Sequence, residues 1–289
     1  VHYAIPHASA AYMAQQILKD QGIKIPFITT LHGTDITLVG KDPSFEPVIN
    51  FSINHSNMVT AVSESLKKET HQLFDIKKEI KVIPNFICLN EYKLDNNEFY
   101  KKRFAPNNEK IICHVSNFRK VKRIEDVLTT FEEISKKTEV KLILVGDGPE
   151  RPRLEKTSRK SAFKENIFFL GSLKSTKEVL NISDLFILPS SKESFGLSAL
   201  EAMACSVPVI ASNSGGIPEV VIHEESGLLN DVGDTNQMTI NALKILSNND
   251  TLEKFKSNAL NQAKKFDIKI ILPRYENLYR KCVDYFLNN

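Results

Sequence analysis

The sequence predicts an α/β protein with two domains, each built on a doubly wound parallel sheet with helices on both faces. Short apolar runs alternate with amphipathic helical stretches along the chain, which is the order typical of parallel sheets. A length of 289 residues is enough for roughly two domains with sizeable cores. A polar stretch at 88–107, rich in Asn, Asp, Glu and Lys, separates the two series, and we interpret it as a linker.

The first domain is predicted to span residues 1–87. Its apolar runs are rich in aliphatic residues and end at turn residues, as buried strands do. Ser63 stands directly before a helical stretch and has the side chain of a typical N-cap. In order, we predict a helix over about 7–20, a strand at 25–31, a helix around 45–54, a strand at 58–62, a helix from 63 to about 74 and a strand at 80–83.

The second domain is predicted to span residues 108–267, and the linker before it holds one short helical piece, Glu98 to Phe104. Apolar residues recur at helical spacing over 124–136, which predicts a helix with one face in a core. The strands of this domain are predicted at 110–115, 141–145, 167–170, 185–189, 207–211 and 227–229. The closing helices are predicted over 235–247 and 251–265, and a last helix begins at 268.

The composition is that of an ordinary globular protein, with 42% hydrophobic and 25% charged residues. A net charge of +3 is too small to argue for nucleic acid or a membrane surface as a partner. No apolar run reaches the roughly 18 residues of a membrane-spanning helix. The four cysteines are scattered along the chain, so neither a disulfide framework nor a cysteine-ligated metal site is predicted. They fit reduced thiols of the cytoplasm: Cys88, Cys113, Cys205 and Cys282.

Two glutamates, Glu193 and Glu201, frame the most informative stretch of the chain. An apolar run at 184–189 precedes them and predicts a buried strand, and the residues after Gly196 have helical spacing. Glu193 is therefore expected on a loop at the carboxyl end of a strand, and Glu201 in the next helix. The turn at 194–196 would leave unpaired backbone amides at the start of that helix, where a phosphate is well placed.

Carboxylates repel phosphate and accept hydrogen bonds from hydroxyls, so each glutamate is expected to hold a sugar of a nucleotide-sugar. Spacing alone favours a simpler interpretation, a loop glutamate and a solvated helical one. The hypothesis of a site therefore depends on the motifs around this pair.

A group of cations, Arg119, Lys120, Lys122 and Arg123, follows the predicted strand at 110–115. Ligands of open α/β sheets bind at the carboxyl ends of the strands. A departing nucleoside diphosphate needs its developing charge neutralised by a metal or by fixed cations. No Asp-x-Asp pattern of the kind that holds a metal occurs, so fixed Lys and Arg are expected. A run of four cations is by itself also typical of a solvated surface.

Two further turns lie at predicted strand ends. The glycines of 146–150 permit a tight turn with close backbone approach, although strand-to-helix turns often need glycine in any case. His32 follows the strand at 25–31. A lone histidine is usually a satisfied core residue, but the flanking Gly33-Thr34-Asp35 favours a side chain that faces a cleft.

These motifs resemble those of a known enzyme family, the retaining glycosyltransferases of family four. The strings that carry the resemblance are Leu31–Asp35, Ser116–Arg123, Val145–Glu150, Glu193–Glu201 and Ser214–Glu219. The family has the GT-B fold, in which two Rossmann-like domains face each other across a cleft. The resemblance implies that the acceptor binds the first domain, that the UDP-sugar binds the second, and that the last helix, 268–289, crosses back to the first. It also implies that the opening part of the first domain, with a glycine-rich loop, lies upstream, so that this domain is incomplete.

Three strings narrow the resemblance to the family-four enzymes of bacillithiol biosynthesis: His2–Ala8, Thr30–Thr37 and Ser116–Arg123. This implies transfer of N-acetylglucosamine from UDP-N-acetylglucosamine to the hydroxyl of L-malate, with retention, in the cytoplasm. The implied partners are these two small molecules, with no nucleic acid, membrane, metal or further cofactor. Assembly into a homo-oligomer is left open.

The resemblance also implies roles for the donor residues. Lys122 matches the usual diphosphate-binding lysine, whereas Asn117 stands where the family usually has an arginine, so Arg119 is expected to supply the guanidinium. Gly196 and Leu197 would donate backbone amides to the distal phosphate. Gly146 would lie near the nucleotide.

The sugars and the base have implied partners of their own. Glu201 would accept hydrogen bonds from the ribose hydroxyls, and Glu193 from hydroxyls of the transferred sugar. The backbone at Gly171 would pair with uracil. On the first domain, His32 would face the anomeric centre, and three residues would touch the acceptor: Tyr3, Thr30 and Thr34.

Three alternatives remain open from the residues. A family-four enzyme could use a polysaccharide, a lipid-linked sugar or an inositol phosphate as acceptor, although no amphipathic membrane helix occurs near residues 1–60. The chain could bind a UDP-sugar without turnover. It could also be another GT-B enzyme, an epimerase or a phosphorylase, but a phosphorylase needs a cofactor-binding lysine in a context that this sequence lacks.

Overall fold

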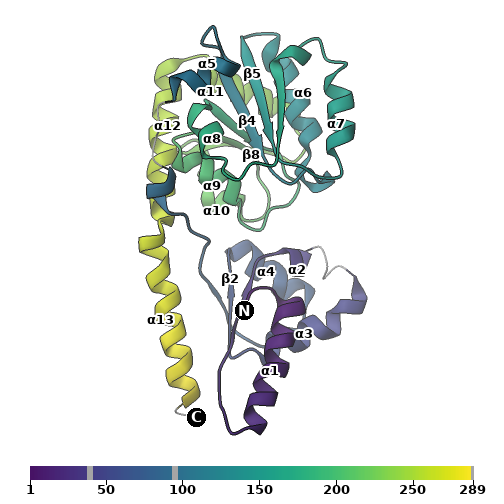
Figure 1. The fold of residues 1–289 in the computed structure, drawn as a ribbon, viewed down its shortest axis with the longest axis vertical. Helices are drawn as coiled ribbons and strands as arrows, with labels where there is room; N and C mark the ends of the chain where they lie inside the picture. Colours follow the sequence, from purple (N-terminus) through teal and green to yellow (C-terminus); the bar gives the residue numbers. More distant parts are fainter. Residues whose placement is uncertain (38–41, 93–96, 288–289) are drawn as a thin grey trace. The chain divides into compact units, whose positions relative to one another are not determined.

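The computed structural model of the protein describes residues 1–37, 42–92 and 97–287. The chain divides into two compact units, one made of Val1–Phe86 with Ile268–Asn289 and the other of Ile87–Asp267 (Figure 1). Both units are built on parallel sheets, as the alternating pattern predicts. No helix in the described parts of the chain is both long and apolar enough to cross a bilayer.

The first unit has a sheet of order β1-β2-β3, with all neighbours parallel. Its strands are β1 (Ile28–Leu31), β2 (Met58–Ala61) and β3 (Ile80–Val82). Its helices are α1 (Ser9–Asp20), α2 (Thr34–Thr37), α3 (Glu46–His55), α4 (Glu64–Leu73) and α13 (Ile268–Leu287). The predicted cap of α4 is confirmed, because the Ser63 hydroxyl accepts a hydrogen bond from the Leu66 backbone amide at 3.0 Å.

Helix α13 belongs to the first unit because of one apolar stripe. Ile271, Tyr275, Leu278 and Cys282 recur at helical spacing and are all buried. The stripe packs with Ile83 beyond the end of β3, and the Tyr275 hydroxyl donates to the Ile83 carbonyl at 3.3 Å.

The second unit has a six-stranded sheet of order β6-β5-β4-β7-β8-β9, again parallel throughout. Its strands are β4 (Lys110–Val115), β5 (Val140–Val145), β6 (Ile167–Gly171), β7 (Leu185–Leu188), β8 (Val209–Ser212) and β9 (Gly227–Asn230). From β4 the chain builds outward through β5 and β6, then returns to place β7 on the other side of β4. This reversal is the switch point at which open α/β sheets bind ligands.

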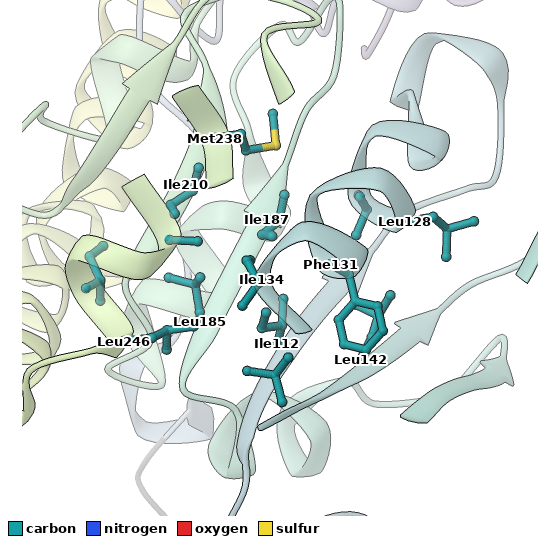
Figure 2. Packing of buried hydrophobic residues seen from close by; sticks show 14 of the residues in the cluster. Ile112, Leu128, Phe131, Ile134, Leu142, Leu185, Ile187, Ile210, Met238 and Leu246 are labelled. Atoms are coloured by element: carbon teal, nitrogen blue, oxygen red, sulfur yellow. The ribbon is translucent and has the colours of Figure 1, made fainter. Parts of the chain in front are cut away.

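The helices of this unit cover both faces of the sheet. They are α5 (Glu98–Phe104), α6 (Ile124–Ser135), α7 (Arg151–Ser158), α8 (Lys177–Ile182), α9 (Leu197–Ala204), α10 (Ile217–Val220), α11 (Thr235–Leu246) and α12 (Asn249–Ala263). The apolar stripe predicted for α6 is buried, and Figure 2 shows its Phe131 and Ile134 among Ile112 and Leu142 of the sheet. Burying one such side chain contributes roughly 1.5–3 kcal/mol, so this cluster stabilises the packing of α6 on the sheet.

The stretch interpreted as a linker, 88–107, falls inside the second unit, apart from residues 93–96, which lie outside the described residues. Helix α5 has the bounds expected for the short helical piece. Phe104 is buried, and its ring meets the Phe168 ring of β6 edge to face at 5.2 Å. This aromatic contact joins the polar stretch to the second unit.

Candidate active site

The switch point of the second unit brings together a cation and a carboxylate that lie far apart in the sequence. Lys122 ends a short 3₁₀ turn after β4, and Glu193 lies on the loop after β7. The Lys122 Nζ forms an ion pair with Glu193 Oε1, and the two side chains are only 18% and 13% exposed. Ser190, fully buried, donates its hydroxyl to the same oxygen at 3.0 Å. Two donors therefore converge on one carboxylate oxygen.

The Gly215-Gly216 pair supports the loop that carries Glu193. The Gly216 amide donates to the Glu193 carbonyl at 2.9 Å. A Cβ on Gly215 would lie 1.9 Å from that same carbonyl oxygen, so only glycine fits against it. The two glycines therefore let the two loops pack closely and hold the backbone at Glu193 by a hydrogen bond.

Helix α9 begins directly after this loop. Gly196 has φ 97°, a left-handed conformation that favours glycine, and it turns the chain into the helix. The first N–H groups of a helix have no partner inside it and, with the helix dipole, attract an anion. Gly196 and Leu197 therefore occupy the position at which a phosphate group can accept backbone hydrogen bonds.

Glu201, farther along α9, is a half-buried carboxylate held by hydroxyl groups. Tyr92 and Thr176 both make side-chain hydrogen bonds to it. Burial raises the pKa of Glu201, and these two hydrogen bonds oppose the rise because they favour the ionised form. Burial, and then the charge of Glu201, raises the pKa of Tyr92 in turn, so its hydroxyl keeps its proton and donates.

The two turn glycines predicted near the nucleotide contact each other. Gly146, after β5, donates its amide to the carbonyl of Gly171, at the end of β6, at 2.8 Å. Arg151 lies against Gly171, where a Cβ would come within 3.1 Å of its Nη1. The same guanidinium donates to Asp147 and to Glu155 at 2.8 Å each.

Arg119 directly precedes the 3₁₀ turn that ends at Lys122. It lines a cavity of about 340 Å³ between the starts of α6 and α7, together with Lys120, Arg123 and Arg153. Lys122 and Glu193 are not among the residues that line this cavity. The backbones of the two cations are nevertheless joined, since the Lys122 amide donates to the Arg119 carbonyl at 2.8 Å.

A buried histidine stands under this site. His114 of β4 has no exposed surface, with its Nδ1 2.8 Å from the Ile187 carbonyl and its Nε2 2.7 Å from the Ser116 hydroxyl. A carbonyl only accepts, so Nδ1 carries the proton and Nε2 accepts from Ser116. Burial lowers the pKa of His114 to about 4, and the charge of Lys122 acts in the same direction.

In the first unit, His32 is paired with a second histidine. His2 Nδ1 lies 2.8 Å from His32 Nε2, and the Tyr3 ring lies 5.1 Å from the His32 ring. One of the two ring nitrogens must be a donor and the other an acceptor, so the contact forms only while at least one ring is neutral. Burial, and then the charge of His2, lowers the pKa of His32 to about 4.

The other predicted acceptor residues lie around this pair. Thr30 is buried, and its hydroxyl accepts from the Thr60 hydroxyl at 2.8 Å, whereas Thr34 is exposed at the start of α2. Asp35 is buried and accepts from the amides of Ala4 at 2.7 Å and Gly33 at 3.1 Å. Burial raises the pKa of Asp35, and the backbone donors oppose that rise. Asp35 thereby ties the segment that carries Tyr3 to the loop that carries His32.

Family models match both parts of the chain. Residues 1–91 match the model described as Glycosyltransferase Family 4, and residues 95–262 match Glycosyl transferases group 1. The chain is also 43% identical over 281 residues to the N-acetyl-alpha-D-glucosaminyl L-malate synthase of Bacillus anthracis, covering 96% of this chain and 73% of that protein. The chain belongs to glycosyltransferase family 4.

A second relative is the 2-deoxystreptamine N-acetyl-D-glucosaminyltransferase of Niallia circulans, 34% identical over 160 residues, or 52% of this chain and 41% of that protein. Among solved structures, the sucrose-phosphate synthase of Thermosynechococcus elongatus has a TM-score of 0.83 at 22% identity, over 98% of this chain and 73% of that one. Anabaena Alr3699/HepE, solved with UDP and glucose, has a TM-score of 0.81 at 23% identity, over 94% and 74%. These likenesses confirm the predicted GT-B fold.

The sequence reasoning missed several residues of this family-four site. His2, Ser190, Tyr92, Thr176 and His114 all contact a predicted site residue or its loop. His2 had one available signal, its place in the string His2–Ala8 that carries the resemblance. Ser190 and His114 lie within three residues of their partners Glu193 and Ser116, but no sequence motif marks them. Tyr92 and Thr176 meet Glu201 only through the tertiary fold. Among the described residues, no three His, Cys, Asp or Glu side chains cluster as metal ligands would.

Proposed function

We propose that this family-four enzyme transfers N-acetylglucosamine from UDP-N-acetylglucosamine to the hydroxyl of L-malate, with retention of configuration. The observation that carries the proposal is the 43% identity, over 96% of the chain, to a relative named for that product. The Lys122–Glu193 ion pair at the switch point supports it, because one contact offers a cation for a diphosphate and a carboxylate for a sugar hydroxyl. The solved Anabaena neighbour with UDP and glucose supports a UDP-sugar as donor.

In this proposal the second unit binds the donor. The charge of the departing diphosphate is met by the Lys122 ammonium and by the backbone amides at Gly196 and Leu197. Fixed cations of this kind make a metal unnecessary for the leaving group. Glu201 holds the ribose, Glu193 holds the transferred sugar, and the hydrogen-bonded strand ends at Gly146 and Gly171 lie against the nucleotide.

The hydrogen bonds of the two glutamates support a binding role and not that of an acid and a nucleophile, a pair that also gives retention in glycosidases. Glycosidases need one carboxyl group to donate a proton and another to attack or to activate water. Glu193 already accepts hydrogen bonds from Lys122 and Ser190, which suits an acceptor of sugar hydroxyls. We propose that the departing diphosphate itself takes the proton of the malate hydroxyl, on the face from which it leaves.

The acceptor is assigned to the first unit, at the loop of His32. We propose that neutral His32, oriented by His2, faces the anomeric centre, with Tyr3, Thr30 and Thr34 around the acceptor.

All four cysteines are free thiols, which fits the cytoplasm as the proposed compartment.

A product assay tests this function. The purified protein is incubated with UDP-N-acetylglucosamine and, separately, L-malate, D-malate, an inositol phosphate and a lipid-linked sugar, and products are analysed by mass spectrometry and NMR. We expect one product, the α-glycoside of L-malate, formed equally well with a chelator present. A β-linked product would overturn retention, a different acceptor would overturn malate, and strict dependence on added magnesium would overturn the fixed-cation argument.

Replacing Glu201 with alanine should weaken UDP binding, because the ribose hydroxyls lose a charged acceptor. Hydrogen bonds to charged groups contribute about 1.5–3 kcal/mol, which is roughly a 10- to 150-fold rise in Kd. Isothermal titration calorimetry with UDP measures the change, and Glu178→Ala, an exposed glutamate on α8, is the matched control. Unchanged affinity in Glu201→Ala would remove the ribose assignment.

A further inference from the structure

Tyr92 lies outside the elements to which the proposed reaction assigns a role. It ends a short 3₁₀ turn, Leu89–Tyr92, that packs beside α9. Its hydroxyl is hydrogen-bonded to the Glu201 carboxylate. Its backbone contacts the same helix, since the Cys205 thiol, directly after the end of α9, donates a long hydrogen bond to the Tyr92 carbonyl at 3.9 Å. The side chain and the backbone of Tyr92 are therefore both tied to the helix that carries Glu201.

Thr176 reaches the same carboxylate from a different element. It is the residue directly before α8, and its hydroxyl also hydrogen-bonds Glu201. Two hydroxyl groups from separate segments thus hold one side chain of α9. A glutamate has three rotatable bonds, and two fixed donors restrict where its carboxylate lies.

The hydrogen-bonding capacity of the carboxylate then decides what else it can bind. An ionised carboxylate offers about four lone-pair positions to donors. Tyr92 and Thr176 occupy two of them, which leaves roughly two. Two neighbouring hydroxyl groups on a sugar ring match these two lone-pair positions, because both hydroxyls can donate to one carboxylate.

We infer that Tyr92 is a positioning residue, which together with Thr176 fixes the Glu201 carboxylate so that its free lone pairs receive the two ribose hydroxyls of the nucleotide. The inference rests on the proposed role of Glu201 and adds the residues that make it selective for a ribose. A ring that only filled space beside α9 would not require the hydroxyl at all.

The experiment separates the hydroxyl of Tyr92 from its ring. Calorimetry measures the Kd of UDP and of 2′,3′-dideoxy-UDP for the unchanged protein and for Tyr92→Phe, Thr176→Val and Glu201→Ala. Loss of one such hydrogen bond should raise the Kd of UDP by about three- to tenfold in Tyr92→Phe and in Thr176→Val. The Kd of the dideoxy nucleotide should stay the same in both, because it lacks the hydroxyls that Glu201 would hold.

Tyr100→Phe is the matched control. Tyr100 belongs to the same unit, and its ring meets the Phe104 ring edge to face, with 5.3 Å between the ring centroids. It should leave both affinities unchanged.

Each remaining outcome counts against a different statement. Equal loss of affinity for both nucleotides in Tyr92→Phe would show that Tyr92 only supports the packing of α9, and would overturn the inference. No loss in Tyr92→Phe, with a selective loss of UDP in Glu201→Ala, would overturn the role of Tyr92 and leave the ribose assignment standing. No selective loss in Glu201→Ala would overturn the ribose assignment itself.

Discussion

Replacing Lys122 with alanine is expected to lower turnover by about a hundredfold or more, which is the usual loss when one donor to a developing charge is removed. The Lys122 ammonium lies at the end of β4 beside the loop that leads to α9, where the diphosphate is proposed to bind. Its charge matters most as the diphosphate leaves, so kcat should fall by more than UDP affinity does. Steady-state release of UDP gives kcat and KM, and calorimetry gives the affinity.

The control for this prediction is Lys160→Ala, an exposed lysine on the turn after α7, which should leave both quantities unchanged. Arg119→Ala is the discriminating variant, because Arg119 lines a cavity that Lys122 does not. Near-normal turnover in Lys122→Ala would move the phosphate role to Arg119, Lys120 or Arg123. A loss of the same size in Arg119→Ala would show that the diphosphate extends toward that cavity.

The lysine variant also leaves Glu193 without its cation, so part of the loss could come from a displaced carboxylate. Ser190 still donates to Glu193 Oε1, which limits that displacement. A double-mutant cycle with Glu193→Gln separates the two causes. If Lys122 acts only through Glu193, the double variant should be no worse than Glu193→Gln alone.

Much of the fold follows from local sequence. The strands β4, β5 and β7 are buried apolar runs, and an apolar run predicts a buried strand without knowledge of its partners. The residues at strand ends could be predicted for the same reason, because parallel strands place their carboxyl ends at one edge of the sheet. The strand-end pattern predicts the group of cations that includes Lys122 and the loop that carries Glu193, and the resemblance singles out Lys122 within that group. The structure joins Lys122 and Glu193 in an ion pair.

The residues that support the site could not be predicted in this way. Tyr92 lies in the polar stretch interpreted as a linker, where one aromatic residue gives no periodic signal. Its partner Glu201 lies on another element, so only the packing of that turn against α9 brings the two together. His2 meets His32 because residues 1–3 run beside β1, where the Tyr3 amide donates to the Thr30 carbonyl at 2.9 Å. The pairing of residues 1–3 with β1 involves too few residues to give a strand pattern in the sequence.

Acid should destabilise the second unit through His114. The pKa of His114 is lowered from 6.5 to about 4 in the folded protein, chiefly by complete burial. Above pH 6.5 the imidazole is neutral in both the folded and the unfolded chain, so it adds no pH dependence. As the pH falls below 6.5, His114 takes up a proton in the unfolded chain, whereas in the folded protein it stays neutral until about pH 4. Folded stability is therefore lost on acidification, by about 3 kcal/mol at pH 4.

Urea unfolding at several pH values between 7 and 4 measures this loss. His114→Gln should be less stable than the unchanged protein at pH 7, because the hydrogen bonds to the Ile187 carbonyl and the Ser116 hydroxyl cannot both be kept. Its unfolding free energy should then fall less steeply with acid, since the group that takes up the proton is gone. His71→Gln, an exposed histidine on α4, should keep the steep dependence. The imidazole ¹⁵N shifts of His114 give the direct reading. Titration near pH 6.5 in the folded protein would mean that the ring accepts a proton at its buried place, and that Ser116 is not held as its donor.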